Sequence, residues 1–210
     1  STNKGVFVES SDALGGDPII VPLGEGDLSA PPKLAQRDDR VVLVVGQRPQ
    51  PMVSALGVFV ADASCSAFTQ VLSIADPGGT GYLQPRIAFG ADGALLILAT
   101  NRFDVGWFRM RLEADGSLTG PFVEADDVEV RGLIARPEGG FWATMMANLD
   151  SLSALLELDA AGAVVDSHVL PEPAWYPLVA RSGGRVHVVY YAPAAVPGDE
   201  LHSVVYGCVR

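Results

Sequence analysis

The chain has 210 residues, of which 49% are hydrophobic and 19% charged, and its formal net charge is −11. The apolar content is too high for a disordered chain, and 23 Gly with 15 Pro indicate a fold rich in tight turns. The 14 Lys and Arg residues against 25 Asp and Glu argue against a nucleic-acid partner, and no apolar run of about 18 residues is present for membrane insertion.

Two short apolar segments stand near the N-terminus, GVFV (5–8) and DPIIVPLG (17–24). Both are predicted strands, because their apolar, largely β-branched residues are bounded by polar and Gly-containing segments. The second segment comes directly before the repeats described next, in the place of the last strand of a preceding repeat. GVFV is then a surplus strand whose own partners lie upstream.

The main signal is a repeat, in which an apolar residue and Ala are followed by a tight turn and then by an apolar, strand-forming run. The four copies are PKLAQRDDRVVLVVGQ (32–47), PRIAFGADGALLILATN (85–101), GLIARPEGGFWATMMAN (132–148) and PLVARSGGRVHVVYYAP (177–193). The apolar–Ala pairs recur at intervals of 53, 47 and 45 residues, a period typical of propeller blades. In three copies Asp-Gly or Gly-Gly supplies the positive φ that a tight hairpin requires.

A second half follows the first three copies, with a polar loop and then another strand, turn and strand. A repeat therefore carries four strands, the usual antiparallel blade of a β-propeller. The sequence predicts one all-β domain over 1–210, with repeats at about 32–74, 85–125, 132–170 and 177–210 and an N-terminal strand at 17–24.

One segment also fits a helix. In DSLSALLELDAAG (150–162) a polar residue stands at the start, Leu152, Leu155 and Leu156 share one helical face, and Gly162 stands at the end. Its place in the repeat matches that of RMRLEADG in the preceding copy, so a strand is expected.

The last copy ends after its third strand, LHSVVYGCVR (201–210). The missing fourth strand is expected to be the N-terminal strand 17–24, because closing the ring removes open sheet edges. Four blades closed in this way are the leading expectation. A five-bladed ring and a fragment of a larger propeller are the alternatives.

The four copies resemble β-propellers as a class, over nearly the whole chain. RIAFGADGALLILATN (86–101) is faintly similar to blades of the NHL and gluconolactonase-like groups, whose inner strands also follow an Asp-Gly turn. No Trp-Asp, kelch or sialidase-type blade signature is present. The likeness implies an architecture and no particular activity.

Candidate ligand-binding residues fall in the connections that a propeller presents on one face. Aromatic residues there can stack on sugar rings or anchor a protein, and Arg residues can bond to either. The candidates are Tyr82, Arg86, Arg102, Arg131, Trp175 and Tyr176. The competing interpretation is that the aromatic residues fill space between blades.

No cofactor is expected, apart from Ca²⁺ as an alternative. Two loops between second and third strands begin alike, so repeat symmetry points their oxygen-bearing side chains to the propeller axis. These candidate ligands are Asn101, Asp104, Asn148 and Asp150. Such residues also cap turns by bonding their own backbone, and the three His residues have no ligand partner at metal spacing in the sequence.

The leading hypothesis is a non-enzymatic binding or scaffold propeller that presents one loop face to a protein or carbohydrate partner. A metal-dependent hydrolase or lactonase with an axial site, and one part of a larger propeller assembly, are the alternatives. The turn-rich, Lys-poor composition and the missing initiating Met favour a secreted or periplasmic protein. If first and last blades are neighbours, Cys65 and Cys208 are candidates for a disulfide.

Overall fold

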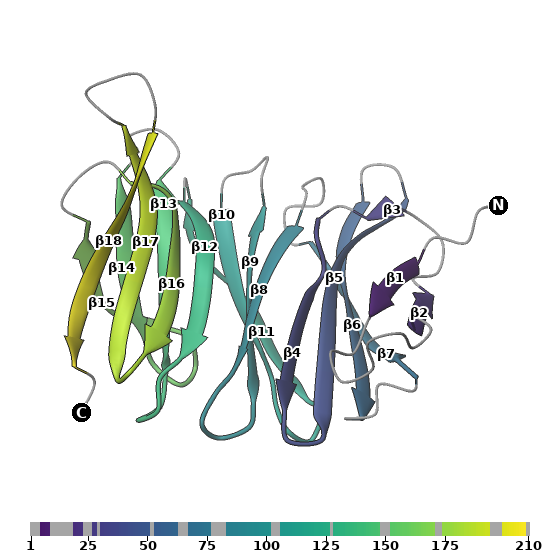
Figure 1. The fold of residues 1–210 in the computed structure, drawn as a ribbon. Helices are drawn as coiled ribbons and strands as arrows, with labels where there is room; N and C mark the ends of the chain where they lie inside the picture. The colour runs from purple at the N-terminus through teal and green to yellow at the C-terminus, as the bar shows by residue number, and fades with distance from the viewer. Residues whose placement is uncertain are drawn as a thin grey trace. The chain divides into compact units, whose positions relative to one another are not determined.

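The computed structural model describes residues 5–8, 19–22, 27–28, 30–50, 53–62, 67–76, 83–101, 106–126, 128–147, 152–170, 174–193 and 199–208. Every helix or strand assigned in these residues is a β-strand, as the sequence predicts (Figure 1). The chain divides into two compact units, Ser1–Pro85 with Asn101–Phe103, and Arg86–Thr100 with Asp104–Arg210. Each unit is described by itself.

The first unit contains one sheet built around a long central hairpin. Its strands are β3 (Asp27–Leu28), β4 (Lys33–Arg37), β5 (Arg40–Gln50), β6 (Val53–Asp62) and β7 (Thr69–Ala75). Both β3 and β4 pair with β5, at different positions along it, so together they occupy the place of a single first strand. β5 pairs with β6, and β6 with β7, which completes an antiparallel four-stranded blade. Leu43, Val45 and Phe59 form its buried cluster.

The N-terminal strands pair with each other. β1 (Gly5–Val8) and β2 (Ile19–Pro22) form a two-stranded antiparallel sheet. This differs from the expected pairing of segment 17–24 with the last blade, whose sheet has three strands in the described part of the chain. The physical reason is local: GVFV, expected to be surplus, offers β2 an apolar partner close in the chain.

The second unit contains three consecutive sheets, ordered β11–β10–β9–β8, β12–β13–β14–β15 and β16–β17–β18. The strands are β8 (Leu83–Phe89), β9 (Leu95–Asn101), β10 (Gly106–Leu112), β11 (Leu118–Asp126), β12 (Val128–Ala135), β13 (Phe141–Ala147), β14 (Ser153–Leu158), β15 (Val164–Val169), β16 (Trp175–Ser182), β17 (Arg185–Pro193) and β18 (Asp199–Cys208). Four-stranded antiparallel meanders of this kind are propeller blades. The predicted fold class is confirmed.

The sheet β12–β15 is buried on both faces. One face packs on the sheet β8–β11 through a cluster of Leu96, Leu98, Trp107, Val130, Phe141, Ala143, Leu156 and Leu158. The other packs on the sheet β16–β18 through a cluster of Trp142, Leu155, Leu170, Ala174, Val179, Val186, Val188 and Tyr190. Successive residues of a strand therefore pack into clusters on opposite faces of the sheet, as Leu155 and Leu156 do.

That double burial explains the ambiguous segment 150–162. A strand of a sheet with one solvent-exposed face alternates apolar and polar residues. In β14, by contrast, four consecutive residues from Ser153 to Leu156 are buried. An unbroken apolar run of this kind imitates the apolar stripe of a helix. The structure forms a strand here, as the repeat predicts, and the helix alternative is wrong.

Four hairpin turns of the second unit share one hydrogen-bond pattern. In each, a backbone N–H bonds a carbonyl four residues ahead, and a Gly three residues ahead bonds back. The Gly residues of these four turns, Gly93, Gly116, Gly139 and Gly162, have positive φ of 83° to 104°. This is the three-residue loop that pairs a type I turn with a left-handed residue, so the repeated Gly is required by backbone geometry.

Candidate ligand-binding site

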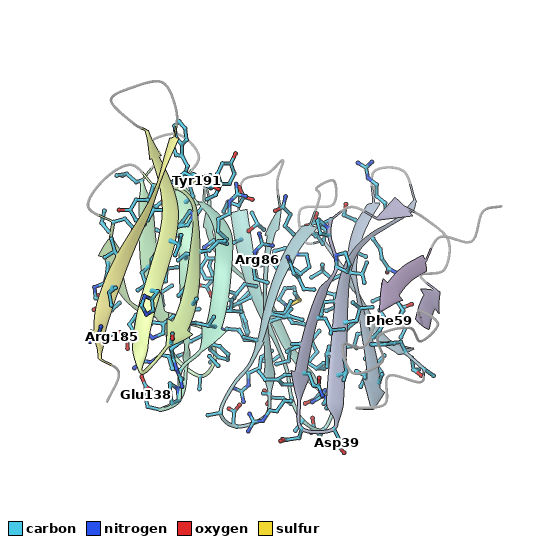
Figure 2. All side chains as sticks on the ribbon, viewed as in Figure 1. Asp39, Phe59, Arg86, Glu138, Arg185 and Tyr191 are labelled. Atoms are coloured by element: carbon cyan, nitrogen blue, oxygen red, sulfur yellow. The ribbon has the colours of Figure 1, made fainter. Side chains whose placement is uncertain are left out.

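The structure places four of the six predicted ligand-binding residues on first strands of successive sheets. Arg86 lies in β8, Arg131 in β12, and Trp175 and Tyr176 begin β16. Arg86 is labelled in Figure 2. Tyr82 and Arg102 lie outside the described residues. The sequence analysis places Arg131, Trp175 and Tyr176 in connections between strands, and this is wrong because β12 begins at Val128 and β16 at Trp175.

Arg131 is the centre of the site. Its Nη2 donates to Glu129 Oε2 at 2.5 Å, and its guanidinium carbon lies 4.6 Å from the centroid of the Tyr176 ring. Its Nε is buried and has no hydrogen-bond partner among the described residues. Glu129 is 8% exposed, whereas Tyr176 is 55% exposed. A partly buried ion pair thus has a largely exposed aromatic ring against its guanidinium.

Arg86 joins this cluster through the backbone. Its Nε donates to the carbonyl oxygen of Arg131 at 2.6 Å. Burial lowers the pKa of Arg86, the charge of Arg131 lowers that pKa further, and Glu129 acts in the opposite direction. Two guanidinium groups from neighbouring sheets therefore act on one another in a partly buried place.

Irregular backbone in β12 and β16 changes the direction in which Arg131 and Tyr176 point from their strands. The register of β12 against β13 shifts between Val130 and Gly132, and that of β16 against β17 shifts between Trp175 and Leu178. Such bulges redirect a side chain from its regular place on the strand. Tyr176 has φ of 53°, a left-handed conformation that bulky residues rarely adopt and that marks functional sites.

Close contacts between the second and third sheets of this unit hold β16 in place. The Thr144 hydroxyl donates to the Pro177 carbonyl at 2.7 Å, and the Ser153 hydroxyl donates to the Ala174 carbonyl at 2.5 Å. Gly132 permits the approach, because a Cβ there would lie 2.7 Å from Thr144 Oγ1 and 3.0 Å from the backbone nitrogen of Val179. The backbone that carries Tyr176 is therefore held by buried bonds on both sides of it.

Trp175 precedes Tyr176 as the first residue of β16. It is half-buried, and its backbone pairs with Tyr191 of β17, whose side chain is exposed (Figure 2). Glu129 was missed by the sequence analysis. The available signal was Glu129-Val130-Arg131, since residues two apart on a regular strand share a face.

Two other Arg residues of the unit have the same kind of neighbours but a different surrounding. Arg109 pairs with Glu124 and lies 4.6 Å from the Phe122 ring. Its Nη1 also donates to the Ala161 carbonyl of the next sheet at 3.0 Å. Arg136 likewise pairs with Glu157, and it lies 5.0 Å from the Trp142 ring. Of these three Arg residues, Arg131 alone has a buried Nε without an acceptor among the described residues.

The side chains of the four predicted metal ligands are outside the described structure. Asn101 ends β9, and nothing of its side chain is described, while Asp104, Asn148 and Asp150 lie outside the described residues. Cys65, one half of the expected disulfide, lies outside them as well.

A different group has metal-binding donors close together. The ligand atoms of Glu157, Asp166 and His168 lie within 4.8 Å of one another. Asp166 and His168 stand two apart in β15, and Glu157 pairs with Asp166 across β14. The sequence spacing offers His168 no such partner, and the structure brings Glu157 to it from the neighbouring strand. Arg136 is bonded to Glu157, so a cation has to compete with a guanidinium for this carboxylate.

Comparison with known proteins defines the architecture. No protein-family profile and no curated protein sequence matches the chain. A solved protein of unknown function from Dyadobacter fermentans has a TM-score of 0.68 at 13% identity, over 97% of this chain and 67% of that one. The β-propeller domain of the trilobed protease from Pyrococcus furiosus has a TM-score of 0.56 at 10% identity, over 88% of this chain and 56% of that one. The chain has a β-propeller fold.

The propeller is also similar to glycoside hydrolases. An alpha-L-arabinofuranosidase from Clostridium thermocellum has a TM-score of 0.52 at 10% identity, over 83% of this chain and 67% of that one. The chain thus spans about two thirds of two of these structures and 56% of the third. At such identities the likeness shows the fold alone. Among the described residues no helix is long and apolar enough to cross a bilayer.

Proposed function

We propose that this protein is a non-enzymatic binding or scaffold propeller whose partner, a carbohydrate or a protein, binds at Arg86, Arg131 and Tyr176. The observation that carries the proposal is the convergence of these side chains from three successive sheets. Rigid sheets hold them, buried bonds of Thr144 and Ser153 fix the nearest strand, and the exposed ring lies on the Arg131 guanidinium. Binding sites need side chains positioned in this way before the ligand arrives.

A carbohydrate is the favoured partner class. An aromatic ring with one face on a guanidinium and much of its surface in solvent provides a platform for the apolar face of a sugar. The glycoside hydrolases among proteins of similar fold agree with this choice. Tyr82, Arg102 and Trp175, named from the sequence, stay proposed as further ligand-binding residues.

Binding to a panel of immobilised oligosaccharides tests the proposal, with Tyr176→Ala as the variant and Phe122→Ala as its matched control. Phe122 is 44% exposed and lies 4.6 Å from Arg109, so both changes remove an exposed ring from an Arg. Loss of binding in Tyr176→Ala alone supports the site. Equal loss in both variants would contradict it, and binding to no member of the panel would move the partner class to protein.

Export is proposed with this function. The Lys-poor, turn-rich composition favours it, and polysaccharide partners occur outside the cytoplasm. Detection of the native protein in the periplasmic or culture fraction of its source checks the proposal, and its recovery with cytoplasmic markers would contradict it.

A metal-dependent hydrolase or lactonase is the second candidate, supported by the faint similarity of 86–101 to gluconolactonase-like blades. In it Asn101, Asp104, Asn148 and Asp150 supply oxygen ligands to Ca²⁺ on the axis. A melting temperature raised by Ca²⁺, together with turnover of a lactone that needs the ion, would establish it. A melting temperature that Ca²⁺ leaves unchanged would reject it.

A third candidate is one part of a larger propeller assembly. The three-stranded sheet β16–β18 and the incomplete coverage of similar structures favour it. A mass in solution that is a multiple of 22.0 kDa would support this reading, and a monomeric mass would oppose self-assembly.

A further inference from the structure

We propose that the ligand of this site is a carbohydrate that bears a carboxylate, such as a uronic acid residue, and that Arg131 with Arg86 binds the acid while Tyr176 stacks on the sugar ring. The inference rests on the proposed function and names its substrate class. It is carried by charge, by donor count and by the conformation of the aromatic residue.

The first argument is charge. Arg86, Arg131 and Glu129 together carry a net charge of +1, and Glu129 is already bonded to Arg131. The two guanidinium groups repel one another where burial weakens solvent screening, as the lowered pKa of Arg86 reflects. A bound anion offsets that repulsion.

The second argument is the number of hydrogen-bond donors on Arg131. Arg131 donates to Glu129 from Nη2, and its buried Nε has no acceptor in the described part of the chain. Buried donors are normally paired, because an unpaired one loses its bond to water without compensation. The protein therefore provides Arg131 with fewer acceptors than it has donors. A planar carboxylate is the acceptor that matches a guanidinium best, through two parallel bonds.

The third argument is the strained aromatic residue beside the charge. Tyr176 keeps a left-handed backbone and 55% exposure directly over Arg131. A folded protein keeps such a conformation where the surrounding structure imposes it, as at ligand clamps. The acid and the stacking surface are then adjacent, which is the geometry of an acidic sugar.

Isothermal titration with trigalacturonate and with its methyl ester tests the inference. The ester keeps the sugar rings and removes the charge. We expect the ester to bind about tenfold or more weakly than the acid, because bonds to a charged group are the stronger ones. Equal affinity for the acid and the ester would overturn the inference.

Variants add two independent checks. Arg131→Ala should lose affinity for the acid, while Arg109→Ala, which removes a matched Arg from Glu124 and Phe122, should keep it. Glu129→Gln removes the competing carboxylate without removing a guanidinium, so affinity for the acid should rise and that for the ester should not. If Arg131→Ala fails to fold, the Glu129→Gln result decides alone, and unchanged or lower affinity for the acid would overturn the inference.

The outcomes separate this inference from the proposed function. If acid and ester bind equally and Tyr176→Ala abolishes both, carbohydrate binding stands and the acid specificity fails. If neither compound binds while a neutral oligosaccharide does, the acid specificity fails again. If no oligosaccharide binds, both the specificity and the carbohydrate class fail.

Discussion

Gly162→Ala tests the packing of successive blades, and its matched control is Gly116→Ala. Both residues occupy the same place in the turn between third and fourth strands, one sheet apart, with φ of 83° and 86°. A Cβ at Gly116 meets no atom within 4 Å, whereas a Cβ at Gly162 would lie 2.5 Å from Leu96 Cδ1 of the preceding sheet. The pair therefore separates backbone strain from packing.

The expected magnitudes follow from these contacts. Each Ala has to adopt a left-handed conformation, which costs about 1–2 kcal/mol in both variants. Leu96 is 1% exposed, so its side chain has to shift within a packed core, and Gly162→Ala is expected to add an overpacking cost of about 1–3 kcal/mol. For a chain of this size that excess lowers the melting temperature of Gly162→Ala by about 2–12 °C more than that of the control.

Tryptophan fluorescence during urea unfolding and heating is the assay, because Trp107, Trp142 and Trp175 all lie in the second unit. Leu96→Ala combined with Gly162→Ala should recover part of the loss, as a coupling in a double-mutant cycle. Equal destabilisation by Gly162→Ala and Gly116→Ala, without that coupling, would show that the turn does not pack on the preceding sheet.

Three further predictions concern buried bonds, acid and strain. Thr144→Val removes the donor to the Pro177 carbonyl without a change in shape, so it should lower the free energy of unfolding in urea by about 1–3 kcal/mol. Thr119→Val, at an exposed position, is the control. If the two variants differ by less than about 0.3 kcal/mol, the Thr144 bond does not stabilise the fold. Burial alone would raise the pKa of Asp92, but hydrogen bonds from Arg111 and the Ala94 N–H lower that pKa. The ionised Asp92 carboxylate should therefore stabilise the fold above a pH of about 4, and this stabilisation should be lost as the pH falls further. The stability difference between wild type and Asp92→Asn should therefore shrink in acid in melting curves, and a constant difference would refute this. Tyr176→Asn should keep stability within about 1 kcal/mol, because Asn tolerates positive φ, while ligand affinity falls; unfolding and titration of the same sample check both, and a large loss of stability would show that the ring is structural.

The candidate site shows where prediction from sequence stopped. The sequence analysis named Arg86, Arg131 and Tyr176 as neighbours on one face, but placed the latter two in loops and gave Glu129 no role. Two bulges and the buried Thr144 bond decide how these residues meet, and none of them has a sequence signature. The cluster of Glu157, Asp166 and His168 was missed for a related reason, since it depends on the pairing register of β14 and β15.

The amino-acid order alone determined the repeated blade, because its signals act over a few residues: a Gly where φ must be positive, and an apolar run long enough for a strand. Tertiary structure decided what lies between blades, namely the double burial of β14, the pairing of β2 with β1 and the meeting of two guanidinium groups with one carboxylate. These contacts join residues tens of positions apart. Their geometry depends on register and on the approach of sheets, which short-range preferences do not encode.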